Sequence, residues 1–133
     1  MKVNIALLTV TDTRTFDNDK SGAILVDKIK EANHNLLDRK LCKDNKDEIV
    51  LILKEWLKNE KIDAIITTGG TGLTGRDITP EALDEVADKH IPGFGEVFRN
   101  ISIKTVGTSA IQSRACAVLS NGKYIFALPG SSG

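Results

Sequence analysis

Short apolar runs recur along the chain and indicate strands. Residues 3–10 (VNIALLTV) and 62–68 (IDAIITT) are nearly continuous runs of that kind, typical of strands buried on both faces. Residues 35–42 (NLLDRKLC) predict a further, weaker strand. Residues 115–120 and 123–129 predict two more, because Asn-Gly between them is the dipeptide most typical of a tight hairpin.

Between these runs, apolar residues recur at helical spacing and predict four helices. One of them should begin with Thr79 as the N-cap and Pro80 in the first helical position, ahead of Glu81. The apolar positions of the four predicted helices are Leu25, Ile29 and Ala32; Ile49, Ile52, Leu53, Trp56 and Leu57; Leu83, Val86 and Ala87; and Phe94, Val97, Phe98 and Ile101.

Alternating strands and helices predict an α/β fold. We expect three layers, α/β/α, with a twisted, mostly parallel sheet and one antiparallel strand near the C-terminus. The 133 residues suit a single domain, residues 1–133. The chain reaches Gly133 directly after its last predicted strand, and a sheet of this kind normally has a helix covering that strand. We therefore expect a further C-terminal helix, or a partner subunit, on that face.

Composition narrows the classes of partner. Lys plus Arg and Asp plus Glu number 18 each, so the formal net charge is zero, which disfavours nucleic acid and anionic membranes. The N-terminus does not resemble a signal peptide, and no apolar stretch approaches a bilayer span. Cys42 and Cys116 are in no metal-ligand or redox spacing and are expected to be small core thiols. A cytoplasmic protein is expected.

Polar or glycine-rich loops follow three of the predicted strands. They are residues 11–14 (TDTR), 69–78 (GGTGLTGRDI) and 129–133 (PGSSG). In open parallel sheets, ligands bind beyond the carboxyl ends of the strands, so these loops predict a site at one edge of the sheet. The middle loop is longer than a usual connection, and its glycines would let backbone N–H groups approach an anion.

Two familiar phosphate motifs do not explain this loop. A Walker loop needs a lysine at the start of the helix, and none lies between Gly69 and Pro80. Gly70, Gly72 and Gly75 match the dinucleotide pattern G-x-G-x-x-G, but the helix begins too late and no strand-end acid follows at the required distance. A purely structural glycine turn stays open, and a nicotinamide-type dinucleotide domain is the weakest alternative.

Three aspartates are candidates for chemistry, each with a structural alternative. Asp77 would otherwise be a loop carboxylate that accepts backbone hydrogen bonds or pairs with Arg76. Asp44 occupies an expected N-cap position, with Asp47 three residues later. Asp12 would otherwise form a turn.

The motifs TTGGTGLTGRDITPEA, IPGFGEVFR, GTSAIQSRA and LPGSSG together resemble the MoaB/MogA family of molybdopterin-binding proteins in molybdenum cofactor synthesis, with IPGFGEVFR and TSAIQSRA closer to the MoaB branch. The resemblance covers nearly the whole chain and implies one molybdopterin-binding domain followed by a further helix. It also implies adenylyl transfer from ATP to the molybdopterin phosphate with Mg²⁺, by a homotrimer or homohexamer. A non-catalytic molybdopterin carrier is the alternative.

The resemblance assigns roles by position. Asp44 and Asp77 match the two key aspartates, here inferred to be Mg²⁺ ligands, although Cys42-Lys43 departs from the family's Pro-Asp before Asp44. Ser132 is a departure in the last loop, where the family has Pro or Thr. The substrate-binding residues expected are Asp12, Gly69, Gly70, Thr71, Gly72, Ser102, Gly130 and Ser131.

Overall fold

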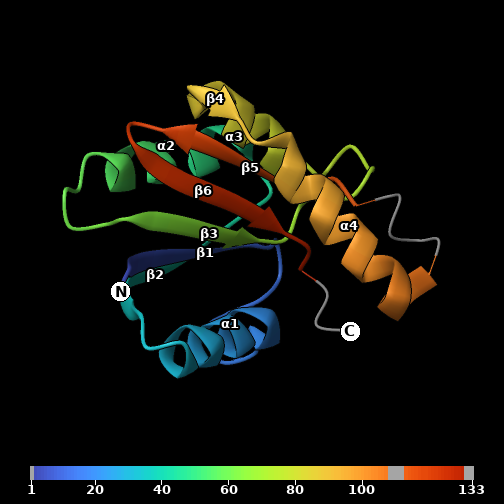
Figure 1. Ribbon diagram of the computed structural model, residues 1–133, viewed down its shortest axis with the longest axis horizontal. Coiled ribbons are helices and arrows are strands. Elements are labelled where there is room, and N and C mark those ends of the chain that lie inside the picture. Colours follow the sequence, from blue (N-terminus) through green and yellow to red (C-terminus); the bar gives the residue numbers. More distant parts are fainter. Residues whose placement is uncertain (1, 108–112, 131–133) are drawn as a thin grey trace.

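The computed structural model describes residues 2–107 and 113–130 and has a mixed six-stranded sheet between two layers of helices (Figure 1). The elements in chain order are β1 (Asn4–Val10), α1 (Lys20–Glu31), β2 (Asn35–Cys42), α2 (Lys46–Leu57), β3 (Ala64–Thr68), α3 (Thr79–Val86), β4 (Lys89–His90), α4 (Pro92–Val106), β5 (Cys116–Ser120) and β6 (Lys123–Leu128).

The strands lie in the order β2-β1-β3-β6-β5-β4. The first four are parallel, and β5 runs antiparallel to both β6 and β4. The expected α/β class, the mostly parallel sheet and the antiparallel strand near the C-terminus are therefore confirmed. The two-residue strand β4 was not predicted, because Lys89–His90 is too short to produce a period-2 pattern.

The predicted hairpin joins β5 to β6. Asn121 and Gly122 have φ angles of 50° and 75°, so both lie in the left-handed region that a two-residue hairpin turn requires. Asn and Gly tolerate that conformation better than other residues, which is why the dipeptide identified the turn.

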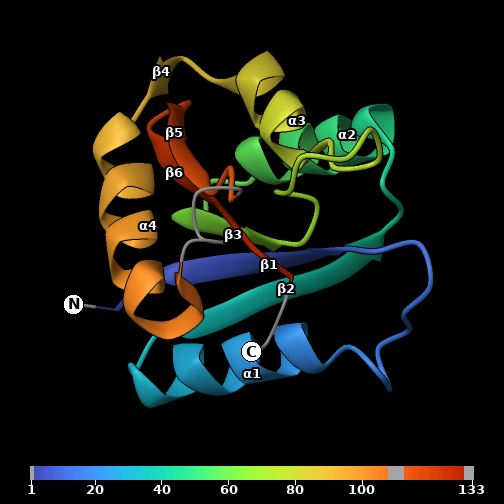
Figure 2. The same cartoon turned by 90° about the vertical axis from the view of Figure 1, so that its right-hand side faces the viewer.

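Alternation along the strands divides the core into two parts. On one face α2 and α3 cover the sheet, and the main core there includes Leu8, Leu53 and Ile65. On the other face α1 covers a smaller cluster formed by Ile5, Ile29 and Ala64. Figure 2 shows α1 and α4 on one side of the strands and α2 and α3 on the other.

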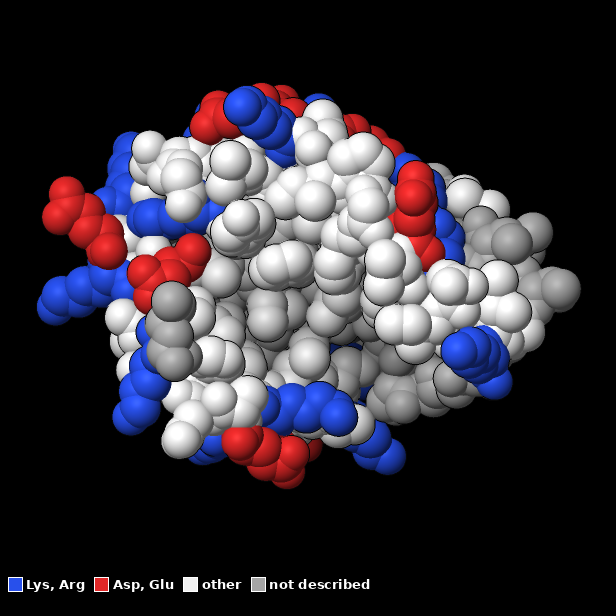
Figure 3. Space-filling view, in the orientation of Figure 1, with Lys and Arg blue, Asp and Glu red and all other residues white. Residues whose placement is uncertain are grey.

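The face that carries α1 and α4 is incompletely covered. Phe94 of α4 packs on Phe126 of β6 with ring centroids 5.2 Å apart, but the neighbouring Tyr124 is 51% exposed. Figure 3 shows few charged atoms over this part of the sheet. The expectation of a further helix stays a prediction.

The two cysteines are free and pack against the main core. Burial raises the pKa of Cys42 to about 12 and that of Cys116 to about 11, so both thiols are protonated at neutral pH. They have the character of core residues, as expected. Across the described parts of the chain, none of the helices combines the length and apolar character that a membrane span requires.

Candidate functional site at the carboxyl ends of the strands

The described parts of the three predicted loops meet because β1, β3 and β6 are parallel neighbours. The amide of Gly69 donates to the carbonyl of Leu128 at 2.9 Å, which joins the ends of β3 and β6. The amide of Thr11 donates to Cys42 O at 2.8 Å, which brings the end of β2 to the same edge. The residues that follow β1, β2, β3 and β6 thus lie together at one edge of the sheet, called the rim below.

Glycines in the loop after β3 are required at three positions. Gly69 and Gly70 have φ angles of 101° and 70°, and a Cβ at Gly70 would lie 3.3 Å from Asp44 Oδ1. A Cβ at Gly72 would lie 2.7 Å from Asp77 Oδ2. Side chains are disfavoured in this loop because Gly69 and Gly70 have left-handed backbones closely approached by Val10 O and Thr79 Oγ1, and because the carboxylate of Asp77 approaches Gly72.

The start of α3 differs from the prediction. Thr79 is the first helical residue, and Ile78 occupies the N-cap position without a side-chain cap. The hydroxyl of Thr79 donates to Gly69 O at 2.9 Å, because the loop folds back over the helix start and offers a buried carbonyl. Thr79 therefore holds Gly69, the first glycine of the loop, by a hydrogen bond and does not cap the helix.

The predicted N-cap role of Asp44 is wrong. Asn45 caps α2, and its side chain accepts from the amide of Glu48 at 3.1 Å. Asp44 lies one residue outside the helix, and its own amide donates to Asp12 Oδ1 at 3.0 Å. The carboxylate of Asp44 is thereby free to face the glycine loop.

Asp12 lies beside Asp44 and forms an ion pair with Arg76 of the glycine loop. The alternative in which Arg76 pairs with Asp77 is therefore wrong. Asp12 connects the loop after β1 to the loops after β2 and β3.

Asp44 and Asp77 differ in how readily they are protonated. Burial and the negative charge of Asp77 raise the pKa of Asp44 above its ordinary value. Hydrogen bonds from the hydroxyl of Thr74, at 2.7 Å, and from its amide, at 2.9 Å, outweigh partial burial and hold the pKa of Asp77 below its ordinary value. The pair thus combines one firmly ionised carboxylate with one that is easier to protonate.

Arg114 was given no role by the sequence, yet it organises the whole loop. Its Nε donates to Gly72 O at 2.7 Å and its NH2 group donates to Asp77 O at 2.6 Å. The same guanidinium forms a two-pronged ion pair with Glu81 of α3. Its backbone amide donates to Thr71 O at 2.7 Å. The only sequence signal was an arginine inside the motif GTSAIQSRA, 33 residues from Glu81.

Arg99 of α4 supports the segment that carries Arg114. Its NH1 group donates to Ser113 O at 3.1 Å and to Ala115 O at 3.0 Å, the carbonyls on either side of Arg114. These contacts link α4 to the glycine loop through residues 113–115.

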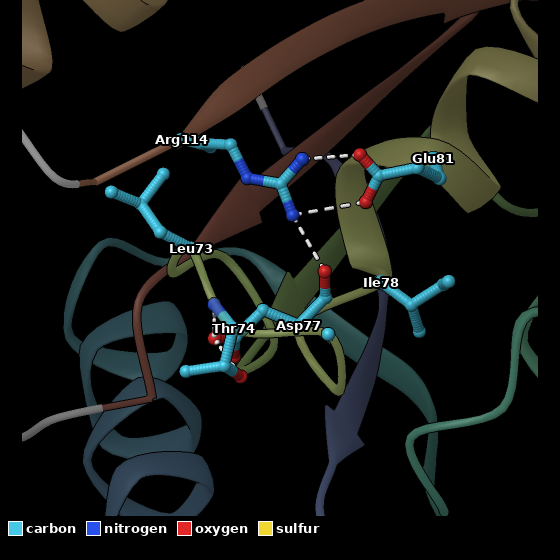
Figure 4. Close-up of a pocket in the computed structure, with 7 residues that line it drawn as sticks. Leu73, Thr74, Asp77, Ile78, Glu81 and Arg114 are labelled. Atoms are coloured by element: carbon cyan, nitrogen blue, oxygen red, sulfur yellow. Dashed lines mark hydrogen bonds and ion pairs between the residues drawn. The ribbon is translucent and has the colours of Figure 1, made fainter.

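An open cavity of about 320 Å³ lies beside the glycine loop. Figure 4 shows Leu73 and Ile78 on opposite sides of it, with the Arg114–Glu81 pair between them and Asp77 below. Leu73 is 66% exposed, which is unusual for a large apolar side chain inside a polar loop. The cavity therefore offers apolar walls next to a carboxylate.

The remaining expected site residues differ in position. Gly130 packs against Gly69, and a Cβ there would lie 3.0 Å from Gly69 Cα. Thr71 is buried. Ser102 lies in the C-terminal half of α4, which points toward the ends of β3 and β6 (Figure 1), but it does not line the cavity beside the glycine loop. Ser131 lies outside the described residues.

Two carboxylates suit magnesium, which takes few protein ligands, better than they suit a metal that needs three or more protein ligands. Within residues 2–107 and 113–130, no group of three or more His, Cys, Asp or Glu side chains is arranged to hold a metal ion. Magnesium uses one or two carboxylates and completes its shell with water and substrate phosphates. Asp44 and Asp77 supply two carboxylates next to a loop that favours anions.

A glycine loop and an acid pair at the carboxyl ends of parallel strands are typical of α/β proteins that bind anionic ligands at this edge. Comparison with known proteins identifies the family. The family model described as "Probable molybdopterin binding domain" matches residues 6–133. The chain belongs to this family, and its relatives and structural neighbours include MoaB and MogA proteins.

Individual relatives agree with that assignment. Molybdenum cofactor biosynthesis protein B of Escherichia coli (strain K12) is 43% identical over 128 residues, 96% of this chain and 75% of the relative. A crystal structure of a molybdenum cofactor biosynthesis protein B has a TM-score of 0.96 at 42% identity, covering 100% of this chain and 83% of that chain. The tungsten cofactor synthesizing protein MoaB from Pyrococcus furiosus has a TM-score of 0.86 at 34% identity, covering 98% and 83%.

Proposed function

We propose that the protein acts in molybdenum cofactor biosynthesis as a molybdopterin adenylyltransferase, transferring AMP from Mg-ATP to the molybdopterin phosphate. The observation that carries this proposal is the approach of Asp44 and Asp77 to the same glycine loop in a chain of the molybdopterin-binding family. The names of the relatives support the pathway, and the acid pair supports the reaction.

In this reaction an oxygen of the molybdopterin phosphate attacks the α-phosphorus of ATP, the bond to the β-phosphate breaks, and pyrophosphate leaves. The attacking phosphate monoester has a second pKa of about 6, so it is largely dianionic at pH 7 and needs no strong base. Catalysis then depends on positioning and on neutralising charge between two polyanions.

The residues at the rim suit those two tasks. Asp44 and Asp77 would hold Mg²⁺, which neutralises phosphate charge when it is bound. The amides around Gly70 and Gly72 would hold phosphate oxygens. The charge of Arg114 is paired with Glu81. Arg114 would therefore hold the conformation of the loop, and the backbone amides of the loop would bind the anion.

A specific observation also favours the alternative, a molybdopterin carrier without chemistry. Thr74 donates two hydrogen bonds to Asp77 Oδ2, as expected of a carboxylate that only shapes its loop. In that case Asp77 would be important for binding the pterin and irrelevant to ATP.

Incubation of the purified protein with molybdopterin, ATP and Mg²⁺ separates the two functions. The expected result is a product heavier than molybdopterin by one adenylyl group, detected by mass spectrometry, that requires both ATP and Mg²⁺. Retention of unmodified molybdopterin on the protein would assign the carrier function.

A further inference from the structure

The residues directly before β5 continue the row of hydrogen-bonded carbonyls along one edge of that strand. In β5 itself, Leu119 O and Ala117 O accept backbone amides from the segment that contains β4, at 2.8 and 2.9 Å. Carbonyls two residues apart in a strand point to the same edge, so Ala115 O and Ser113 O are the next acceptors in this row.

Within the described residues, backbone pairing on this edge ends at Ile91. The next residue, Pro92, has no amide hydrogen and begins α4, so the backbone leaves the strand here. Arg99 of α4 reaches back to the unpaired part of the row, where its NH1 group donates to Ala115 O at 3.0 Å and to Ser113 O at 3.1 Å. The guanidinium of Arg99 therefore supplies the donors that a longer β4 would have supplied.

A glycine inside α4 makes room for this contact. Gly95 is buried, and a Cβ there would lie 2.8 Å from Ala115 O and 2.6 Å from the NH2 group of Arg99. Glycine weakens a helix relative to alanine, so its presence inside α4 needs a packing reason. The close approach of the helix to residues 113–115 supplies that reason.

The opposite edge of the same short stretch holds the glycine loop. The amide of Arg114 lies on the other edge from the two carbonyls that flank it, and it donates to Thr71 O at 2.7 Å. The side chain of Arg114 also holds the loop at Gly72 O and at Asp77 O, the second of which is drawn in Figure 4. Residues 113–115 thus lie between α4 and the glycine loop and are hydrogen-bonded to both.

Water would not easily replace the donors of Arg99. Ala115 is 2% exposed, and a buried carbonyl that loses its donor is destabilising. Without the guanidinium, residues 113–115 would therefore shift toward solvent, and Arg114 and the loop that it holds would shift with them.

We propose that Arg99 is a positioning residue for the site. It extends the edge of β5 in place of a strand, and through residues 113–115 it makes the position of the glycine loop depend on α4. This role concerns the conformation of the loop and holds whatever reaction the site performs.

The first test adds one methyl group to α4. Gly95→Ala should separate the helix from residues 113–115, because the new Cβ has no room there. The amide hydrogens of Thr74 and Arg114 should then exchange about tenfold faster, the value of one charged hydrogen bond. The amide of Asp88, at the far end of the same edge, should exchange as in the wild type. Gly93→Ala is the matched control, since a Cβ at Gly93 meets nothing within 4 Å, and it should leave all three amides unchanged.

Two outcomes of this test would overturn the positioning role. Unchanged exchange at Thr74 and Arg114 in Gly95→Ala would show that the loop does not depend on α4. Equally faster exchange at Asp88 would show that the contact stabilises the whole protein and positions nothing in particular.

The second test removes the donors and keeps the length of the side chain. Arg99→Met should give the same faster exchange at Thr74 and Arg114, and Arg99→Lys, which keeps a charged donor, should restore part of the protection. Arg99→Met combined with Gly95→Ala should differ little from either single variant, because both changes break the same contact. Fully additive effects would show that the two changes act on different contacts and would contradict the proposal.

Turnover tests the link to the proposed function. In adenylyl transfer, a displaced loop would align the phosphates poorly, so Gly95→Ala should lower kcat about tenfold at saturating substrates and Gly93→Ala should not. Amide exchange needs no substrate, so it tests the positioning role separately from the reaction. Local loosening of the loop in Gly95→Ala, with no adenylylated product from the wild type, would overturn the transferase alone. Adenylylated product from the wild type, with unchanged exchange in Gly95→Ala, would overturn the role of Arg99 alone.

Discussion

At the scale of single residues, Arg114 and Asp44 show how the site depends on contacts between distant parts of the chain. Arg114 holds two carbonyls of the glycine loop and the carboxylate of Glu81 with one planar guanidinium. Asp44 faces the loop because the neighbouring Asn45 caps α2 in its place. Both roles arise from geometry that neighbouring residues in the sequence do not reveal.

Replacement of Arg114 by lysine keeps the positive charge and removes the fork of donors. We expect Arg114→Lys to lower the free energy of unfolding by about 1–3 kcal/mol, because buried or partly buried acceptors lose their partners. The amide of Thr74, which donates to Asp77, should exchange its hydrogen faster. Urea unfolding and hydrogen exchange measure the two effects without any substrate.

Arg76→Lys is the matched control for that change. Arg76 is exposed and pairs with Asp12 at the surface, so its replacement should change the free energy of unfolding by less than about 1 kcal/mol. Equal stability and equal Thr74 exchange in Arg114→Lys and the wild type would show that the guanidinium does not position the loop.

At the scale of secondary structure, the sequence predicted most elements because their patterns are local. The apolar run at residues 3–10 and the Asn121-Gly122 turn became β1 and the β5–β6 hairpin. The starts of α2 and α3 were misplaced, because several adjacent residues are able to cap and tertiary contacts decide among them. The candidate aspartates were singled out from their loop positions and received their roles from the family motifs, whereas Arg114 needed the three-dimensional structure.

Helix α1 depends on a buried N-cap. Asp19 caps the helix through the amide of Gly22 and forms an ion pair with Arg39, and its side chain is fully buried. The replacement leaves the partly buried charge of Arg39 without its partner, so Asp19→Asn should lower the free energy of unfolding by about 3 kcal/mol. Urea unfolding at pH 7 measures this loss.

The same carboxylate gives a pH dependence of known sign. The pKa of Asp19 is lowered on folding, so its contribution to stability is present above the ordinary value of 3.8 and is lost as the pH falls through the folded-state pKa. The difference between wild type and Asp19→Asn should therefore shrink below about pH 4. Asp17→Asn, at an exposed position, is the control, and a constant difference at all pH values would contradict the account.

At the scale of the whole molecule, the parallel sheet gathers residues from four loops at one edge. The order β2-β1-β3-β6 places the ends of these strands side by side, so segments more than a hundred residues apart, such as Ser21 and Gly130, come into contact. The face of the molecule that carries α1 and α4 leaves apolar side chains exposed. They are Val97 and Ile101 of α4 and Tyr124 of β6. Assembly as a homotrimer or homohexamer stays a prediction for that surface.

In the proposed function, Asp44 and Asp77 form one metal-dependent centre for adenylyl transfer. The most direct measurement compares pyrophosphate release by the wild type and by Asp77→Asn with molybdopterin, ATP and Mg²⁺, together with substrate binding by isothermal titration. Asp84→Asn, an exposed change on α3, serves as the control. We expect Asp77→Asn to keep substrate binding and to lose turnover by about 100-fold or more. Unchanged turnover in Asp77→Asn would contradict it.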